Sequence, residues 1–448
     1  MRLISLLACF AFTISLYLID LKKTTHFSKS LWVPLFWMLL ISSRSVSDWL
    51  NPAFSVTAES ADAWSQTNTL ERNISLLFMV IGFSILMMRR MKWSDMIKNN
   101  GWLIWLYYYC IISLVWSDLP FTSFKRLIRD FTTIIMVLVI LTDSKPFEAL
   151  KTIIRRCMYI LIPLSIVLIK WFPEYGRYWG PYGGNGLNIG ACDGKNALGL
   201  VCAIGGLFFV SELIVLLRNR KLSSEQLSLV INIIFLAMIS FLFILADSQS
   251  SFLSLIIAIG ILITIDMARN NIKYTGVIFF HITLIVIVIL STNFINMLIE
   301  SLGRDVTMTG RTDLWEYLMQ IKINPLVGTG YKTFWTGHRL DQIWRDFWWH
   351  PKQAHNGYLE IYLNLGIMGL LSLIALIITT YKYNKDKLSF SFEMGKLSMA
   401  IFFMLIIYNW TEATFISSSP IWFIFLFTMI KVPTPMSVSE PLQHLPSV

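Results

Sequence analysis

The amino-acid sequence predicts an all-α, polytopic helical membrane protein with about 12 transmembrane helices (roughly 11 to 13). Its composition supports this class, because 55% of the 448 residues are hydrophobic, only 14% are charged and the mean hydropathy is +0.62. Apolar stretches close to the roughly 20 residues that cross a bilayer recur along almost the whole length. We therefore expect one integral membrane domain over residues 1–448 and no separate soluble domain.

The apolar runs place the predicted spans in chain order. The run from Leu3 to Ile19 resembles a signal sequence, but no small-residue cleavage site follows it, so a retained helix is predicted. The runs at 31–43 and 131–142 are short, which also fits an interfacial or re-entrant segment. The predicted spans are 4–20, 31–43, 73–89, 101–116, 131–142, 155–172, 195–217, 228–246, 251–267, 274–293, 358–380, 397–410 and 419–431.

Basic residues gather in the short loops on one side of these spans, and that side is predicted to be cytoplasmic. The opposite side then receives the loops at 44–72, 117–130, 173–194 and about 294–357. A loop as long as the last one is usually functional in a compact membrane domain. The basic residues are Arg89, Arg90, Lys92, Lys151, Arg155, Arg156, Arg218, Arg220, Lys221, Arg269, Lys273, Lys382, Lys385 and Lys387.

The extracytoplasmic loop at 294–357 is rich in aromatic side chains, which indicates that it packs against the membrane face. After Arg311, the residues Leu314, Leu318 and Ile321 recur at helical spacing. Short amphipathic helices are therefore predicted in this loop, the first of them following Arg311. The aromatic residues are Trp315, Trp335, Trp344, Phe347, Trp348 and Trp349.

Charge and cysteine usage exclude several classes of function. The formal net charge is +10, but the basic residues form no patch with interleaved aromatics, so no nucleic-acid partner is expected. None of the five cysteines has metal-ligand spacing. No Walker loop, dinucleotide fingerprint or Ser-His-Asp motif occurs in a fitting context. We therefore expect no metal site and no cofactor.

Three motifs of the long loop follow one another in a recognisable order. They are Gly310-Arg311-Thr312-Asp313-Leu314-Trp315, Asn324-Pro325-Leu326-Val327-Gly328-Thr329-Gly330-Tyr331 and His355-Asn356-Gly357-Tyr358-Leu359-Glu360. Together, in a membrane context, they resemble the O-antigen ligase and O-antigen polymerase (Wzy-type) superfamily, although any one of them alone would be weak. The Trp-Ser-Asp-Leu-Pro turn at 116–120, which precedes Arg126, is similar to the exopolysaccharide-production polymerase branch.

This resemblance implies a metal-independent, inverting glycosyl transfer at the periplasmic face of a bacterial inner (cytoplasmic) membrane. The donor would be an undecaprenyl-diphosphate-linked glycan, and the acceptor a sugar hydroxyl of another lipid-linked repeat unit, in exopolysaccharide or O-antigen biosynthesis. Membrane lipids, a flippase and a chain-length regulator fit as partners. The alternative is an O-antigen ligase that transfers finished polymer to lipid A core. A polysaccharide or lipid transporter is less favoured, because no internal inverted repeat is evident.

The leaving diphosphate needs its charge neutralised, and arginine suits this task because its planar fork binds phosphate oxygens and stays protonated. The candidates on the outer side are Arg311, Arg126, Arg129 and Arg304. For Arg126 and Arg129 the alternative is a side chain that only reaches from a helix end to the interface.

The acceptor hydroxyl needs a base, and His355 is the best candidate, because imidazole titrates near neutral pH and this residue precedes the outer entry of a span. The alternative is a histidine hydrogen-bonded in an interfacial cap. His350 is the first rival, and His338 is weaker. Asn356 directly follows His355 and is expected to support it.

Charged residues at the edges of spans are costly unless paired, so each is a candidate for a supporting role. Glu412 is predicted to orient His355 or to pair with Arg311, and Glu360 to lie near the outer surface; either could be a plain structural partner. Lys195 loosely matches the superfamily's Lys-Asn-Leu-Gly helix entry. It follows a glycine-rich loop that could hold an anion at a helix N-terminus or form a simple interfacial turn.

Overall fold

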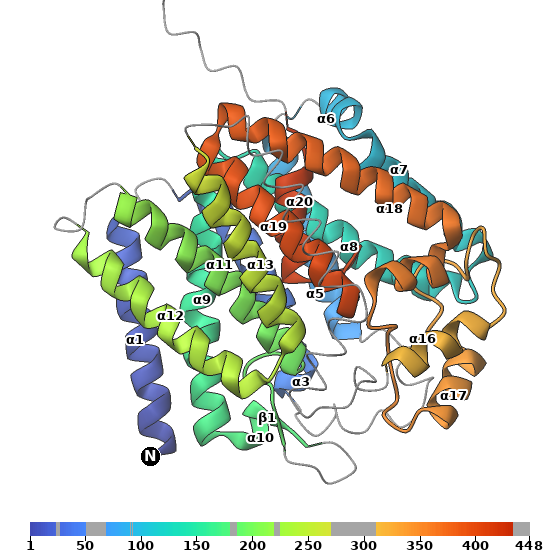
Figure 1. The fold of residues 1–448 in the computed structure, drawn as a ribbon, viewed down its shortest axis with the longest axis horizontal. Coiled ribbons are helices and arrows are strands. Elements are labelled where there is room, and N and C mark those ends of the chain that lie inside the picture. The colour runs from blue at the N-terminus through green and yellow to red at the C-terminus, as the bar shows by residue number, and fades with distance from the viewer. Residues whose placement is uncertain are drawn as a thin grey trace, which may run out of the picture.

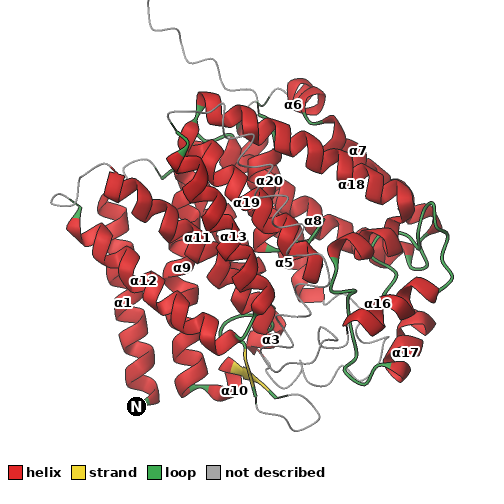
Figure 2. Cartoon of the chain, viewed as in Figure 1, coloured by secondary structure: helices red, strands yellow, loops and turns green. Residues whose placement is uncertain are grey.

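The computed structural model confirms an all-α, polytopic membrane protein (Figures 1 and 2). Eight described helices are long and apolar enough to cross a membrane, and three shorter apolar helices accompany them. One ribbon of two short antiparallel strands, β1 (Arg177–Tyr178) and β2 (Leu187–Asn188), interrupts the helical pattern in the part that the structure describes. The structure describes residues 1–23, 27–50, 69–89, 91, 93–179, 186–218, 225–269 and 311–432, so the predicted span at 274–293 and Arg304 lie outside the described residues.

Each predicted span within these ranges forms a helix. The helices are α1 (Arg2–Lys23), η1 (Lys29–Leu31), α2 (Trp32–Ser42), α3 (Val46–Leu50), α5 (Thr69–Met88), α6 (Trp93–Asn99), α7 (Gly101–Ile112), η3 (Ser113–Trp116), α8 (Pro120–Leu141), α9 (Pro146–Trp171), α10 (Pro173–Gly176), α11 (Lys195–Arg218), α12 (Gln226–Ala246), α13 (Gln249–Met267), α16 (Arg311–Gln320), α17 (Gly337–Asp346), α18 (Gly357–Phe390), α19 (Phe392–Thr411) and α20 (Pro420–Met429). Helices α9, α11, α19 and α20 form the buried centre, whereas α1, α5 and α12 leave much of their apolar surface exposed.

Ion pairs mark the two ends of the helical bundle. At one end Arg2 pairs with Glu174 of α10 at 3.0 Å, so the chain begins beside the loop that precedes α11. At the other end of α1, Asp20 pairs with Arg155 at 3.1 Å and with Arg156 at 2.7 Å. We call these the N-terminal end and the basic end. Those residues predicting the cytoplasmic side that fall in the described part of the chain, such as Arg89, Arg155 and Arg218, lie at the basic end.

The expectation of a loop over 117–130 is wrong, because α8 begins at Pro120. Proline suits the first turn of a helix, where its missing N–H needs no partner. The charged residues of this stretch lower its hydropathy, so hydropathy alone does not predict this part of the helix. Arg126 and Asp130 pack against the loop after α16 rather than against lipid, and Asp130 is buried there. Arg126 and Arg129 therefore stand on a helix and not on a loop.

Residues 311–356 form a segment with a small core of its own, which we call the α16–α17 segment (Figure 1, orange). The helix predicted after Arg311 is confirmed as α16, and α17 follows it. The core draws on both helices, on the turns between them and on the first turns of α18. Its buried members are Leu314, Leu318, Phe334, Trp335, Leu340, Ile343, Trp344, Ala354 and Leu363.

Helix α18 is broken at Gly366, whose φ of 64° and ψ of −166° are not helical. A break inside a membrane helix frees backbone groups that must find partners. The turn at 325–330 supplies them, and we call this arrangement the latch. Its bonds run from Thr329 N to Leu363 O (3.2 Å), Gly330 N to Asn364 O (2.9 Å), Ile367 N to Pro325 O (2.9 Å) and Met368 N to Leu326 O (3.2 Å).

Glycine is required where the two backbones of the latch meet. A Cβ on Gly366 would lie 2.3 Å from the carbonyl carbon of Leu326, and one on Gly328 would lie 2.4 Å from that of Asn364. Both glycines also have φ between 60° and 70°, at 64° and 69°, a region that other residues rarely adopt. The motif at 324–331 therefore has a structural role: it completes the broken helix that His355 precedes.

Candidate active site

The carboxylate of Glu412, just after α19, joins side chains from distant parts of the chain. Its Oε1 accepts hydrogen bonds from Arg311 Nη2 at 2.9 Å and from Asn196 Nδ2 at 2.6 Å. Its Oε2 lies 3.4 Å from His355 Nδ1 and accepts a bond from Gln353 Nε2 at 3.3 Å. The structure thus brings Arg311 and His355 together on a single carboxylate, and Glu412 contacts both of the partners expected for it.

Arg311 is the first residue of α16, and its guanidinium is held from two sides. Besides the bond to Glu412, its Nη1 donates to the carbonyl of Thr411 at 2.7 Å. The Arg311 side chain is 15% exposed and that of Glu412 only 5%. Because the pair is largely withdrawn from water, loss of either partner would leave an uncompensated charge.

His355 lies at the entrance to α18 in a left-handed backbone conformation, with φ of 49°. Such a conformation costs about 1–2 kcal/mol in a residue other than glycine, so its surroundings must hold it. Asn356 does part of this, because its Oδ1 accepts bonds from the N–H groups of Tyr358 and Leu359 and caps the helix. The ring of Trp349 lies on another side, 5.8 Å from the imidazole between centroids. The backbone therefore aims the imidazole at Glu412.

Glu360 stabilises the loop before α18 and does not belong to the Glu412 cluster. Its carboxylate accepts bonds from the Trp335 indole N–H and the Ala354 backbone N–H, each at 2.9 Å. Asn364 Nδ2 donates to it at 3.0 Å. These neutral donors anchor the residue before His355, so the structure favours the structural reading of Glu360.

Arg126 lies in a second cluster, centred on Asp130 of α8. Arg126 donates to the backbone carbonyl of Lys332, and Lys332 Nζ lies 2.6 Å from Asp130 Oδ2. The Tyr331 hydroxyl donates to the same oxygen at 2.5 Å, and burial raises the pKa of this phenol well above its ordinary value.

Asp130 and Lys332 were missed by reasoning from the sequence. Asp130 directly precedes the apolar run at 131–142, and an ionisable residue at the edge of a span was a usable signal for it. No such signal pointed to Lys332. In the structure its φ is 54°, a conformation that is uncommon for a residue other than glycine.

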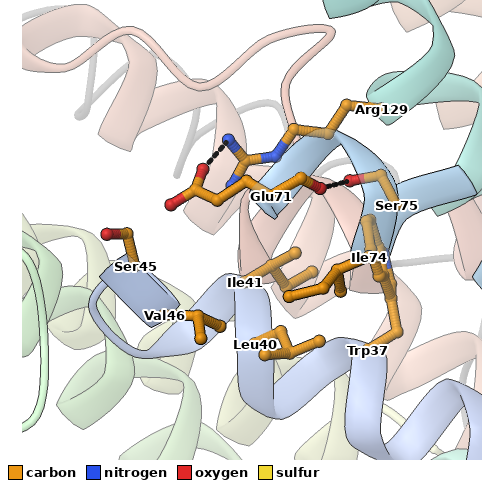
Figure 3. A pocket seen from close by; sticks show the side chains of 9 residues that line it. All are labelled: Trp37, Leu40, Ile41, Ser45, Val46, Glu71, Ile74, Ser75 and Arg129. Carbon is orange, nitrogen blue, oxygen red and sulfur yellow. Dashed lines mark hydrogen bonds and ion pairs between the residues drawn. The ribbon is translucent and has the colours of Figure 1, made fainter. Parts of the chain in front are cut away.

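Arg129 is not among the described contacts of Glu412 and pairs with Glu71 of α5 at 3.4 Å (Figure 3). The pair borders a pocket of about 30 Å³ between α2, α5 and α8, whose floor includes Trp37 and Ile74. A pocket of this size has room for a water molecule or two but not for a sugar. The Arg129 side chain is 44% exposed, which leaves it open to an anion from outside.

Lys195 begins α11, but the next residue, Asn196, makes the contact with Glu412. Reasoning from the sequence did not single out Asn196, which directly follows Lys195. Just before it, Asp193 accepts a bond from the backbone of Ser45 at 3.2 Å. Solvent reaches the Asp193 side chain, yet the protein packed around it and the nearby Asp48 carboxylate raise its pKa to about 6.

The rival histidines lie elsewhere on the α16–α17 segment. The exposed ring of His350 stacks on Trp344 with 4.9 Å between centroids, and His338 is exposed on α17. Neither is among the contacts of Glu412 in the described part of the chain. Across the described ranges, no group of three or more histidine, cysteine, aspartate or glutamate side chains is placed to hold a metal ion.

Comparison with known proteins relates part of the chain to a known sequence family. Residues 233–374, which include α16, α17 and His355, match the sequence family described as O-antigen ligase. This match and the apolar helices support a relation to the O-antigen ligase and polymerase superfamily, a class of membrane glycosyl-transfer enzymes. A relative within it is the exopolysaccharide production protein ExoQ of Rhizobium meliloti (strain 1021). It is 22% identical over 330 residues, which cover 69% of this chain and 71% of ExoQ.

Proposed function

We propose that the protein is a membrane glycan polymerase. It transfers a polyprenyl-diphosphate-linked oligosaccharide or polysaccharide onto a sugar hydroxyl of another lipid-linked repeat unit. The observation that carries this proposal is the placement of Arg311 and His355 on the shared carboxylate of Glu412, since one can serve the leaving group and the other the acceptor. The similarity to a protein named for exopolysaccharide production supports the choice of polymerase.

In the proposed reaction, the acceptor hydroxyl oxygen attacks the anomeric carbon from the face opposite the diphosphate. The bond from that carbon to the phosphate oxygen breaks, and its electron pair leaves with the undecaprenyl diphosphate, so the configuration is inverted. The hydroxyl proton passes to Nε2 of His355. Glu412 faces Nδ1 at 3.4 Å and stabilises the imidazolium that forms.

Arg311 is proposed to neutralise the departing diphosphate. A guanidinium carries more N–H donors than the bonds to Thr411 and Glu412 use, so donors remain for phosphate oxygens. Arg126 and Arg129 are the further proposed contacts for the diphosphate, with Lys332 beside Arg126. The site would face the periplasm from a bacterial inner membrane, because the basic end of the bundle is the opposite one.

The ligase reading is the second candidate, and the family match described as O-antigen ligase favours it. Both reactions use the same donor end and differ in the acceptor. Deletion of the gene distinguishes them: a polymerase leaves single lipid-linked repeats without long polymer, whereas a ligase leaves long polymer on its lipid carrier without attachment to lipid A core.

The decisive experiment is polymerisation in vitro by purified protein in nanodiscs, with lipid-linked repeat units extracted from the host strain. Long lipid-linked products are expected with and without excess chelator, because Arg311 and its basic neighbours are proposed to hold the diphosphate without a divalent ion. Activity that chelator abolishes and magnesium or manganese restores would contradict the metal-independent mechanism. Absence of polymer from active-site-intact protein would contradict the polymerase function itself.

A further inference from the structure

Two adjacent tryptophans, Trp348 and Trp349, stand on the α16–α17 segment beside His355, and we call them the doublet. Trp348 is 71% exposed. Trp349 is partly buried, with its ring centroid 5.8 Å from that of His355 and the ring planes tilted by 48°. Phe347 supports Trp349 from below through an edge contact of 6.2 Å between centroids. Trp349 thus offers aromatic surface beside the proposed base, and the exposed Trp348 precedes it directly in the chain.

Three other tryptophans of this segment have a structural role, because their indole N–H groups donate hydrogen bonds within it. The indole N–H of Trp315 donates to Ala354 O at 2.7 Å, that of Trp335 to Glu360, and that of Trp344 to Pro351 O at 2.9 Å. These bonds fix the loop before His355. Trp335 and Trp344 are also buried in the core of the segment, whereas Trp348 faces outward.

The surroundings of the doublet indicate water rather than lipid. Helix α17, which leads to it, exposes Asp341, Arg345 and Asp346, and Lys352 is exposed on the other side. Charged side chains in this number would be costly in contact with hydrocarbon. Large aromatic surface that faces water among polar groups is typical of a binding surface.

We propose that the doublet is the acceptor subsite, on which pyranose rings of the acceptor glycan stack. The proposal rests on the proposed function. One face of a pyranose is lined with C–H groups and its rim carries hydroxyls, so the ring is apolar toward an indole and polar toward Lys352, Gln353 and water. A sugar on Trp349 would bring its hydroxyls beside His355, which needs such a neighbour for proton transfer. Trp348 would take the next sugar of the chain.

The test compares side chains that keep or lose the flat ring. Trp349→Leu and Trp348→Leu keep apolar bulk, whereas Trp349→Tyr keeps an aromatic face. Trp179→Leu is the matched control, because Trp179 is a 51% exposed tryptophan on another loop of the N-terminal end. Each variant is assayed in nanodiscs with the lipid-linked repeat as donor. The soluble acceptor is the oligosaccharide released from these lipids by mild acid.

Trp349→Leu is expected to raise the KM for the soluble acceptor about tenfold while kcat changes little, because lost stacking weakens binding and not proton transfer. Trp348→Leu should have a smaller effect of the same kind, and Trp349→Tyr should restore most of the loss. Trp179→Leu should match the parent. In parallel, saturation-transfer NMR should show contact of the oligosaccharide with the parent protein and loss of that contact in the double leucine variant.

Three outcomes would overturn the subsite. The first is an unchanged acceptor KM in well-folded Trp349→Leu, and the second is an equal effect of Trp179→Leu. The third is quenching of Trp348 fluorescence by brominated lipid, which would make the doublet a membrane anchor. If the parent protein makes no polymer but the NMR contact persists and depends on the doublet, the proposed function fails while the glycan-binding surface stands.

Discussion

At the residue scale, Glu412 holds together groups that have different tasks in the proposed reaction. Its two oxygens face Arg311 and His355 separately, at 2.9 Å and 3.4 Å. Asn196 and Gln353 add neutral donors to the same carboxylate. Glu412 thereby contacts both the arginine proposed to bind phosphate and the histidine proposed as the base, and holds the two at a defined separation.

This arrangement predicts that losses at His355 and Arg311 differ in kind. His355→Ala should lower turnover by roughly two to four orders of magnitude with donor binding nearly intact, as general-base assistance is lost. Arg311→Lys should not restore activity, because a point ammonium cannot reproduce a planar phosphate contact. Single-turnover kinetics and binding of labelled donor measure the two effects. His355→Ala that polymerises at the parental rate, at normal protein levels, would identify His355 as a cap only.

The raised pKa of Asp193 predicts a pH-dependent stability. Asp193 has a pKa of about 6 in the native state against an ordinary value of 3.8. Between these two pH values the native state keeps a proton that the unfolded chain has released. This contribution to stability is present at low pH and is lost as the pH rises through about 6. Asp193→Asn keeps the acceptor oxygen for Ser45 without the charge.

The variant should therefore unfold at a higher temperature than the parent at pH 7.5, and the difference should shrink as the pH falls through about 6. Thermal unfolding in nanodiscs across this pH range measures it. A constant difference at every pH would mean that the ionisation of Asp193 is not involved.

At the scale of single elements, the latch explains how α18, the membrane helix that follows His355, can be broken at Gly366. The turn at 325–330 satisfies the freed backbone groups of α18, and Tyr109 adds a bond from its hydroxyl to Leu365 O at 3.0 Å. The loop after α16 is thereby tied to the helix that His355 precedes. The position of the base depends on this junction as well as on its own cap.

Gly366→Ala should destabilise the protein by about 3 kcal/mol or more, because the added Cβ meets Leu326 and the backbone conformation is left-handed. Gly260→Ala is the matched control, since Gly260 lies in α13 and its added Cβ would meet nothing within 4 Å. Apparent melting temperature and the yield of monodisperse protein compare the two. Equal behaviour of both variants would contradict a tight latch.

At the scale of the whole molecule, the candidate site and the basic loops lie at opposite ends of the bundle. Helix α11 begins beside Glu412, through Asn196, and ends where Arg218 pairs with Glu393 at 2.7 Å. Helix α18 likewise runs from His355 toward Lys387. A polymerase that uses lipid carriers needs this polarity, because its glycan substrates must meet on one side of the membrane.

Cysteine labelling tests the polarity with positions that are exposed. Asp341→Cys on α17 should react with an impermeant maleimide in intact spheroplasts, and Asp386→Cys near the end of α18 should react only after permeabilisation. The parent protein serves as the background control for its own cysteines. The reverse pattern would invert the orientation and place the proposed reaction on the cytoplasmic side.

Local patterns in the chain were enough to predict the class, the order of the spans and the gathering of the basic loops on one side. Hydropathy is a local property and the membrane has a fixed thickness, so an apolar run of sufficient length indicates a span wherever it occurs. The motifs also singled out Arg311 and His355, and the cost of an unpaired charge at the edge of a span singled out Glu412. Hydropathy failed at α8, because the charges around Asp130 face protein rather than lipid.

The contacts between these residues became evident only in the folded molecule. Asn196 and Glu412 are 216 positions apart, and no local pattern predicts that they share a hydrogen bond. The same is true of Lys332 with Asp130, and of Gly366 with Leu326. Such contacts depend on how helices pack and where loops return, and packing is a property of the whole chain. The residue types suitable for the chemistry were therefore visible in the sequence, whereas their partners became visible only in the folded molecule.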